Sequence, residues 1–309
     1  MARILITGGA GFVGSSLAER LLNNPAYHVV LIDNLLTGDI RKVPSNPRCQ
    51  FIRCDVNRLT EIAAVMSEQS FDYVFHYAAV VGVARTIENP LMVLNDLEGI
   101  KNILSLCRDT GVKRFFYSSS SEVYGEPVEL PQHEETTPLN SRLPYAVVKN
   151  VGESFCRSYQ KEYGLDYTVF RFFNTYGPKQ STDFVISKFI KSAQQNLPIT
   201  VYGSGQQTRT FCYIDDNTEC TVRILEDKLV VNEVINIGSD IDVTILQLAE
   251  LIIRMTGSNS KIEFLPPLSE GDMTRRQPDS TKMKLILNNQ ELISLEDGMK
   301  RILDAQILN

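Results

Sequence analysis

The feature that most restricts the fold is a glycine-rich turn near the start of the chain. The strand-like run ILIT leads directly into TGGAGFVGS, residues 7–15. Gly9, Gly11 and Gly14 match the G-x-G-x-x-G pattern, and Gly8, Gly11 and Gly14 recur every three residues. Glycine here permits a tight turn and close approach of a pyrophosphate, while the next helix offers free N–H groups. A strand, a glycine turn and a helix in this order predict a dinucleotide-binding unit.

An acidic residue follows at the distance that this interpretation requires. Asp33 ends the second strand-like run, VVLID. A carboxylate there accepts hydrogen bonds from two ribose hydroxyls and repels a 2′-phosphate, which favours NAD over NADP as the cofactor. Asp55 and Val56 follow the third strand-like run and are candidates for a place beside the adenine, although a helix N-cap is an equally good interpretation of Asp55.

Strand-like and helix-like segments alternate through the first half of the chain. The expected strands are 4–7, 29–33, 50–55, 73–79, 114–120 and 167–173, and the expected helices are 15–22, 91–108 and 146–162. This alternation predicts an α/β fold with a doubly wound parallel sheet, the Rossmann arrangement. Later segments favour a strand at 233–238 and a helix at 246–255. We expect a cofactor-binding domain at residues 1–176 and an interleaved, smaller substrate-binding region at 177–309.

Composition narrows the possible partners. The net charge is −6 and the chain has no long Lys/Arg block, so nucleic acid is not an expected partner. The six cysteines lack metal-binding spacing, which predicts free thiols in a reducing compartment and no metal site. The longest apolar stretch, 71–84, is too short to cross a membrane, and the N-terminus has no signal-peptide pattern. We expect a soluble, cytoplasmic protein.

Two motifs indicate a reaction centre. Tyr145 and Lys149 stand four residues apart at the start of a helix-like segment, so they share one face. A lysine ammonium beside a phenol favours the phenolate, which makes the tyrosine a usable base for a sugar hydroxyl. The polar run SSSSEVYG, residues 118–125, ends a strand where folds of this type bind ligands. Without the glycine turn, a Tyr packing on a Lys stem would be the better interpretation.

These motifs together resemble the extended short-chain dehydrogenase/reductases that modify nucleotide sugars. The resemblance covers nearly the whole chain and includes TGGAGFVGS, HYAA at 76–79, SSSSEVYG, RFFNTYGP at 171–178 and GSGQQTR at 203–209. It implies that bound NAD oxidises a hexose hydroxyl to a 4-keto intermediate. It also implies that Tyr145 is the base, that Lys149 holds the nicotinamide ribose, and that Ser120 hydrogen-bonds the reacting oxygen. The implied cofactor contacts are Gly8, Gly11, Phe12, Val13, Gly14, Asp33, Asn34, Asp55, Val56, Ala78, Ala79, Tyr145 and Lys149.

Glu122 leaves the outcome of the reaction open. In similar 4-epimerases this place is commonly small and neutral, whereas decarboxylases and 4,6-dehydratases of the family often have a glutamate there. A carboxylate can remove the proton next to the new keto group or steer an acidic substrate. Ser121 stands where the usual dehydratase acid is an aspartate, and PYAVVK at 144–149 is similar to GDP-mannose dehydratase. A turn-capping carboxylate away from the substrate is the alternative for Glu122.

The resemblance also implies substrate contacts in the later part of the chain. Asn174 is similar to a family asparagine that contacts sugar or phosphate, and Arg209 and Arg276 fall where diphosphate-binding arginines are found. Arginine suits this role because its planar fork pairs with phosphate oxygens. Val201 and Tyr202 resemble the wall of a nucleobase pocket. The pattern around Arg276 favours a decarboxylase, whereas the segment 80–90 is closer to epimerases.

Two classes of function therefore remain. The favoured one is an NAD-dependent enzyme acting on a nucleotide-diphosphate sugar, with a UDP-sugar 4-epimerase ahead of a 4,6-dehydratase, a UDP-glucuronate decarboxylase or a net C4 dehydrogenase. The other is a non-catalytic NAD-binding sensor or scaffold. A sensor has no need of a base beside the nicotinamide, so Ser120, Tyr145 and Lys149 argue for the enzyme. The amphipathic segments 91–108 and 147–162 predict the helix bundle through which family members form homodimers.

Overall fold

The structure is a computed structural model that describes residues 1–267 and 274–305. It forms two compact units, each built from several separate segments. The first unit contains residues 1–123, 141–172 and 218–235, and the second contains 124–140, 173–217 and the described part of 236–309. The chain thus leaves and re-enters each unit. The predicted division of roles between residues 1–176 and 177–309 concerns binding and stays a prediction.

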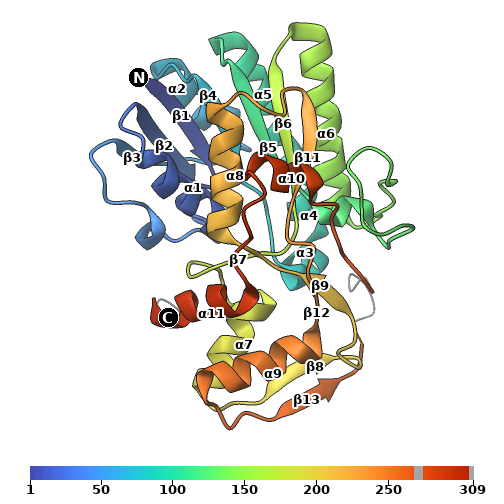
Figure 1. The fold of residues 1–309 in the computed structure, drawn as a ribbon. Coiled ribbons are helices and arrows are strands. Elements are labelled where there is room, and N and C mark those ends of the chain that lie inside the picture. The colour runs from blue at the N-terminus through green and yellow to red at the C-terminus, as the bar shows by residue number, and fades with distance from the viewer. Residues whose placement is uncertain (268–273, 306–309) are drawn as a thin grey trace. The chain divides into compact units, whose positions relative to one another are not determined.

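The first unit is built on a seven-stranded sheet (Figure 1). The strand order is β11-β6-β5-β4-β1-β2-β3, and the neighbours from β3 through β6 pair in parallel. The order reverses between β1 and β4, which is the point where doubly wound sheets bind their ligands. The strands are β1 (Ala2–Thr7), β2 (Tyr27–Asp33), β3 (Cys49–Arg53), β4 (Tyr73–His76), β5 (Arg114–Ser120), β6 (Asp166–Phe172) and β11 (Glu233–Ile237). The predicted fold class is confirmed.

Helices connect these strands. They are α1 (Phe12–Leu22), α2 (Leu59–Glu68), α3 (Val83–Glu88), α4 (Pro90–Leu94), α5 (Asp96–Thr110), α6 (Pro144–Tyr163) and α8 (Ile214–Glu226), with short 3₁₀ turns at η1 (Ile40–Lys42) and η2 (Ser121–Tyr124). Helix α6 begins with a proline and ends at Gly164, whose φ of +71° suits a residue without a Cβ. The helix expected at 91–108 is interrupted at Asn95, where the Glu98 amide bonds the Asn95 carbonyl in a tighter turn.

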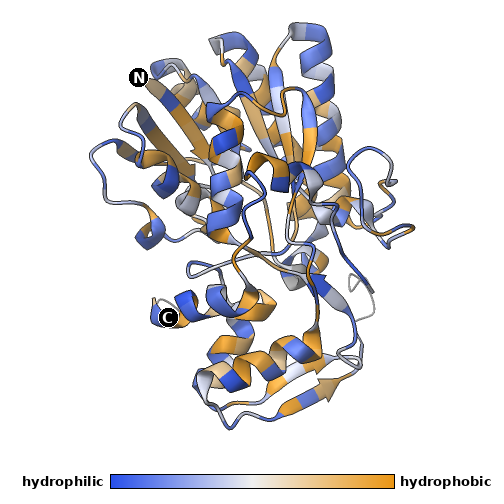
Figure 2. Ribbon diagram, viewed as in Figure 1, coloured by the Kyte–Doolittle hydropathy of each residue, from blue (hydrophilic) through white to orange (hydrophobic). Residues whose placement is uncertain are grey.

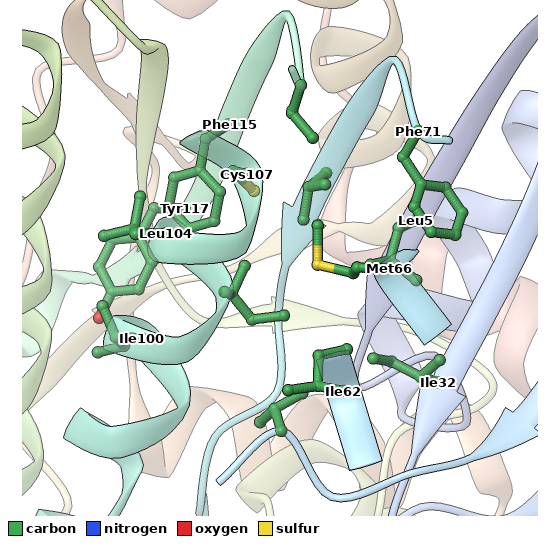
Figure 3. Close-up of a cluster of buried hydrophobic side chains, with 14 of the residues drawn as sticks. Leu5, Ile32, Ile62, Met66, Phe71, Ile100, Leu104, Cys107, Phe115 and Tyr117 are labelled. Carbon is green, nitrogen blue, oxygen red and sulfur yellow. The ribbon is translucent and has the colours of Figure 1, made fainter. Parts of the chain in front are cut away.

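Both faces of the sheet in the first unit carry buried hydrophobic residues. The strands carry mainly hydrophobic residues (Figure 2), as expected when helices cover both sides. Alternate strand residues such as Leu5, Phe115 and Tyr117 pack against Ile62 of α2 and Leu104 of α5 in one buried cluster (Figure 3). This packing holds the carboxyl ends of the strands, which carry the polar residues, in fixed positions.

The second unit has smaller sheets and its own helices. Strand pairs β8 with β13 and β7 with β10 are parallel, and β9 with β12 is antiparallel. The elements are β7 (Thr175–Tyr176), α7 (Val185–Gln194), β8 (Ile199–Tyr202), β9 (Thr208–Thr210), β10 (Cys212–Tyr213), β12 (Asp242–Thr244), α9 (Ile245–Thr256), β13 (Ile262–Leu265), α10 (Thr281–Ile286) and α11 (Leu295–Asp304). Among the described residues of both units, none of the helices combines the length and the apolar character that a membrane span requires.

Candidate active site

The glycine turn leaves β1 and forms the start of α1. The Gly11 amide donates to the Gly8 carbonyl at 3.0 Å, which closes the turn. Gly11 is also the N-cap of α1, and no side chain of the described residues caps this end. The first amide groups of the helix are therefore available to an external acceptor, and the helix dipole favours a negative one.

Two of the glycines are required by close backbone contacts. Gly8 has a φ of +68°, and a Cβ added there would lie 2.8 Å from the Ala78 amide nitrogen and 2.9 Å from the Tyr77 carbonyl. A Cβ on Gly14 would overlap the Gly8 carbonyl. The turn is thus packed against the loop after β4 with no space for side chains. Its shape is that of a cradle lined by backbone, which suits a pyrophosphate.

Asp33 lies at the end of β2, beside the turn. Its carboxylate accepts hydrogen bonds from the Ala10 amide at 3.1 Å and from the Leu35 amide at 2.8 Å. Burial raises the pKa of Asp33, whereas these two amides and Lys42 oppose that rise. The carboxylate is held at the turn and has lone pairs left for further donors. The neighbouring Asn34 instead turns its side-chain oxygen to the Leu36 amide at 3.0 Å.

The second acidic candidate, Asp55, does not cap a helix. Its carboxylate accepts from the Asn57 amide at 3.0 Å, and α2 starts later, with Arg58 as its N-cap. The helix-cap interpretation is therefore wrong, because the side chain closes a local turn instead. The Val56 carbonyl accepts from the Asn102 side chain at 3.0 Å. A role for Asp55 and Val56 beside the adenine stays a prediction.

Thr7 and His76 join the two strands at the point where the strand order reverses. The Thr7 hydroxyl accepts from the amides of Tyr77 at 3.1 Å and Ala78 at 3.0 Å, so its proton is left for His76 Nδ1, 2.9 Å away. Neutral His76 then carries its proton on Nε2. Burial, assisted by Lys149, lowers the pKa of His76 to about 3. His76 is therefore a neutral structural residue, and the hydroxyl of Thr7 positions the loop that carries Ala78 and Ala79.

Lys149 reaches the strand that carries the serines. Its Nζ donates to the Ser118 carbonyl at 2.7 Å and to the Ser118 hydroxyl at 3.3 Å, and that hydroxyl donates to the His76 carbonyl at 3.1 Å. Lys149 is only 4% exposed. Burial lowers its pKa to about 8, partly opposed by the charge of Asp96. The ammonium is fixed at the carboxyl end of β5 and is close to titrating at neutral pH.

Tyr145 occupies the first turn of the same helix. The Lys149 Nζ lies 5.7 Å from the centre of the Tyr145 ring and 5.2 Å from that of Tyr117. Ser120 is the last residue of β5, and its hydroxyl accepts from the Glu122 amide at 3.2 Å. The structure thus brings Tyr145 close to Lys149 and places Glu122 one short turn beyond Ser120. An ammonium next to a phenol can support removal of a proton from an alcohol.

The candidate substrate residues all belong to the second unit, except Ser120. The Asn174 side chain donates to the Thr210 carbonyl at 3.0 Å. Arg209 and Arg276 are 8% and 6% exposed, and Arg209 donates to the Thr208 carbonyl at 2.8 Å. Both arginines are therefore largely removed from water, which is uncommon for a charged side chain. The roles of these residues in binding stay predictions.

Val201 and Tyr202 are adjacent residues of β8 with different exposure. The Val201 side chain is 0% exposed, so it packs inside the second unit, whereas Tyr202 is half-buried. Their strand partners on β13 are Phe264 and Leu265, respectively. Of the two, Tyr202 has the side chain that a nucleobase could reach, and the predicted pocket wall stays a prediction.

The sequence motifs did not identify several buried polar residues around the site. Asp96 accepts from the Val80 amide at 2.7 Å, and burial raises its pKa while Lys149 opposes the rise. Glu153 and Arg171 form a buried ion pair on α6 and β6. Glu153 follows Lys149 by four residues on one helix face, which is the single sequence signal that connects it to the site.

Comparison with known proteins identifies the family. The model of the NAD dependent epimerase/dehydratase family matches residues 4–238. The chain is 36% identical to UDP-glucuronic acid decarboxylase 1 of Xenopus tropicalis, over 97% of this chain and 70% of that protein. It is 35% identical to UDP-N-acetyl-alpha-D-glucosaminuronate decarboxylase of Bacillus cytotoxicus, over 96% of this chain and 95% of that protein.

A solved structure agrees with the sequence comparisons. UDP-glucuronic acid 4-epimerase from Bacillus cereus, in complex with UDP-glucuronic acid and NAD, superposes with a TM-score of 0.89 at 34% identity and covers 98% of each chain. The resemblance inferred from the motifs is thereby confirmed, as are the predictions of an enzyme and of NAD as its cofactor. The chain belongs to the NAD dependent epimerase/dehydratase family and is an NAD-dependent enzyme.

Proposed function

We propose that this enzyme oxidises the C4 hydroxyl of a UDP-linked sugar and returns the hydride to the opposite face, as a UDP-sugar 4-epimerase. The observation that carries the proposal is the buried ammonium of Lys149, which is bonded to the Ser118 carbonyl at 2.7 Å and lies 5.7 Å from the Tyr145 ring centre. This arrangement stands at the same sheet edge as the glycine turn. It suits reversible removal of a proton from an alcohol beside a dinucleotide.

Each residue of the first unit then has a distinct task. Ser120 holds the sugar oxygen, Tyr145 takes its proton, and Lys149 keeps a positive charge beside the phenol. NAD, when bound, would supply a reversible hydride acceptor for this chemistry. Return of the proton from Tyr145 restores the hydroxyl, so atoms and charges balance over one cycle. The glycine turn and Asp33 would hold the pyrophosphate and the adenosine ribose.

Residues of the second unit would bind the nucleotide part of the substrate. Arg209 and Arg276 have the forked shape that pairs with phosphate oxygens, and both are largely buried. Tyr202 offers a half-buried ring for a base, beside the fully buried Val201. Asn174 would contribute a hydrogen bond to sugar or phosphate. UDP is the favoured nucleotide because it occurs in the names of all three reported relatives.

Decarboxylation of a UDP-hexuronic acid is the second candidate, and Glu122 is the reason. Two decarboxylases are similar to the whole chain, and the Glu122 amide bonds the Ser120 hydroxyl at 3.2 Å. Oxidation at C4 places a carbonyl two bonds from the carboxylate carbon of a uronic acid. Loss of carbon dioxide then moves the electron pair of the broken bond into that carbonyl, and an acid must protonate C5. A glutamate one short turn beyond Ser120 is a candidate for that acid.

One experiment separates the two candidates. The purified enzyme is incubated with NAD and with UDP-glucose, UDP-glucuronate or their N-acetyl forms, and products are followed by chromatography and mass spectrometry. A product of unchanged mass and new retention time supports the epimerase, and loss of carbon dioxide supports the decarboxylase. If the enzyme is a decarboxylase, Glu122→Gln should abolish product formation, while an epimerase should keep most of its activity. Glu135→Gln, an exposed carboxylate elsewhere, is the matched control.

A homodimer is part of the proposal. Leu91 is 75% exposed on α4, and Met92, Leu94 and Val147 of α4 and α6 are 37% to 38% exposed. Adjacent apolar side chains on packed helices favour a protein partner, here a second copy of the chain. Sedimentation velocity should give a dimer, and Leu91→Asp should shift it towards monomer. A wild-type monomer at micromolar concentration would contradict this. The cytoplasmic location expected from the sequence stays a prediction.

A further inference from the structure

Three buried polar side chains form a hydrogen-bonded network at β5, the strand that carries Ser118, Ser119 and Ser120. The Ser119 hydroxyl donates to Glu153 Oε1 at 2.7 Å, Arg171 Nε donates to the same oxygen at 2.9 Å, and Arg171 Nη2 donates to Oε2 at 2.8 Å. The three residues are 2%, 0% and 3% exposed. Arg157 adds a longer contact to Glu153 from the surface, at 3.6 Å. Both oxygens of the Glu153 carboxylate are therefore hydrogen-bonded away from water.

Each member of the network comes from a different element that frames the reaction centre. Ser119 stands between Ser118, which binds Lys149, and Ser120 on β5. Arg171 is the direct partner of Ser119 on β6. Glu153 lies one turn after Lys149 on α6. The network thus fixes the helix that carries the base to the strand that carries the serines.

Stability alone is a poor explanation for this network. A buried ion pair gains little over apolar residues of the same volume, because both charges must lose their hydration. The ion pair instead provides geometric specificity. A bidentate guanidinium–carboxylate pair has a defined geometry, whereas hydrophobic contacts are non-directional and do not fix one element relative to another. Contact at Gly152 is already tight, because a Cβ there would overlap the Tyr117 hydroxyl. This contact limits how closely the helix approaches the strand, whereas the ion pair sets its position along the strand.

We propose that Ser119, Glu153 and Arg171 are positioning residues that set the alignment of Tyr145 and Lys149 with Ser120. None of the three is among the residues to which we assign contacts with the sugar or NAD. Their role rests on the proposed function, in which the hydroxyl, the phenol and the ammonium act together. A displacement of about 1 Å can lower a rate about 10²-fold, so a helix held in this way has a measurable effect on turnover.

The first test removes one hydrogen bond and keeps the ion pair. Ser119→Ala should lower kcat about tenfold and leave KM and the affinity for NAD within about twofold, because substrate contacts are intact. Ser154→Ala is the matched control, since Ser154 is an exposed serine beside Glu153 on the same helix. It should leave kcat unchanged. A Ser119→Ala enzyme that melts at a lower temperature yet keeps full kcat below that temperature would show a purely structural role and overturn the proposal.

The second test replaces both charges, because a single loss would leave a buried unpaired charge and unfold the protein. The double variant Glu153→Met/Arg171→Met should melt near the wild-type temperature and lose about 10²-fold in kcat. Its pH profile should also lose the alkaline limb that Lys149 imposes, because an ill-placed ammonium no longer limits the rate. A stable double variant with wild-type kcat would contradict the proposal.

A third measurement needs no substrate and separates the two proposals. The ¹⁵N signal of the Lys149 ammonium, identified by its loss in Lys149→Met, should be visible in the NAD-bound wild type, because that group is buried and bonded to Ser118. It should broaden or disappear in Ser119→Ala and persist in Ser154→Ala. If no sugar is turned over but the signal behaves in this way, the proposed function fails and the positioning role stands. An unchanged signal in Ser119→Ala rejects the positioning role.

Discussion

The glycine turn and the reaction centre share one sheet edge but are built in opposite ways. The turn is made by backbone within a few residues of β1, and its close packing is possible because Gly8 and Gly14 lack side chains. The candidate reaction centre depends on side chains from distant segments, because Lys149 comes 31 positions after Ser118 and Glu153 comes 34 positions after Ser119. A site of the first kind is damaged by adding atoms. A site of the second kind is damaged by removing them.

The largest effect is expected from removing one oxygen at the reaction centre. Tyr145→Phe should lower kcat about 10³-fold, because general-base catalysis is lost while the ring keeps its place. NAD should bind as in the wild type, since the turn is untouched. Steady-state kinetics and calorimetry with NAD measure the two effects, and Tyr163→Phe, at an exposed tyrosine of the same helix, is the control. Equal turnover in Tyr145→Phe and the wild type would remove Tyr145 from the mechanism.

Adding one methyl group should damage the turn instead. Gly8→Ala should weaken NAD binding about 10- to 100-fold, because the new Cβ meets the backbone of Tyr77 and Ala78. Gly111→Ala is a matched control, because Gly111 has a similar positive φ of +74° and no atom within 4 Å of the added Cβ. It shares the backbone strain without the collision. If both variants bind NAD equally well, the close packing of the turn has no role in binding.

A smaller and selective effect is expected at Asp33. Asp33→Ala should weaken NAD about tenfold and NADP much less, because hydrogen bonds to the ribose hydroxyls are lost for NAD alone. Fluorescence titration with both cofactors measures the ratio, with Asp39→Asn as a nearby control. Equal losses for NAD and NADP would show that Asp33 does not face the adenosine ribose.

The smallest effect concerns the shape of the pH profile. Burial lowers the pKa of Lys149 to about 8, so its ammonium is present below that pH and lost above it, well before a lysine in water would lose its proton. The rate constant kcat/KM should therefore fall above about pH 8. Lys149→Arg keeps its charge and should move this fall to higher pH, at a lower overall rate. If kcat/KM of Lys149→Arg falls at the same pH as that of the wild type, the fall is caused by the titration of another group.

Much of this fold could be predicted from local sequence patterns. The strand runs and helix periods recur along the chain, and β1, β5 and α6 lie where they were expected. The glycine turn could also be predicted, because it is formed by residues close in sequence whose backbone conformation requires glycine. The interruption between α4 and α5 at Asn95 could not be predicted, because the helical pattern of hydrophobic residues continues through this position. The return of residues 218–235 to the first unit depends on tertiary packing, which local patterns do not encode.

The candidate site could be predicted only where its residues form a motif. Tyr145 and Lys149 are related by helical spacing, and Ser120 ends an obvious strand. Arg171 and Thr7 become recognisable only once the sheet pairs Arg171 with Ser119 and Thr7 with His76. For Asp55, the sequence left a helix cap and a place beside the adenine open, and the local turn with Asn57 excludes only the cap. Contacts between residues that are far apart in the sequence depend on the tertiary fold, so local sequence patterns do not predict them.

Analysis of the reaction products decides whether this protein is a UDP-sugar-modifying enzyme. The purified enzyme is given NAD and each UDP-sugar in turn, and the product mass, its retention time and the cofactor absorbance are recorded together, with Tyr145→Phe beside the wild type. We expect a C4-modified UDP-sugar from the wild type, no net accumulation of NADH, and almost none of that product from Tyr145→Phe. Tight binding of NAD without conversion of any sugar would contradict it and favour a non-catalytic role.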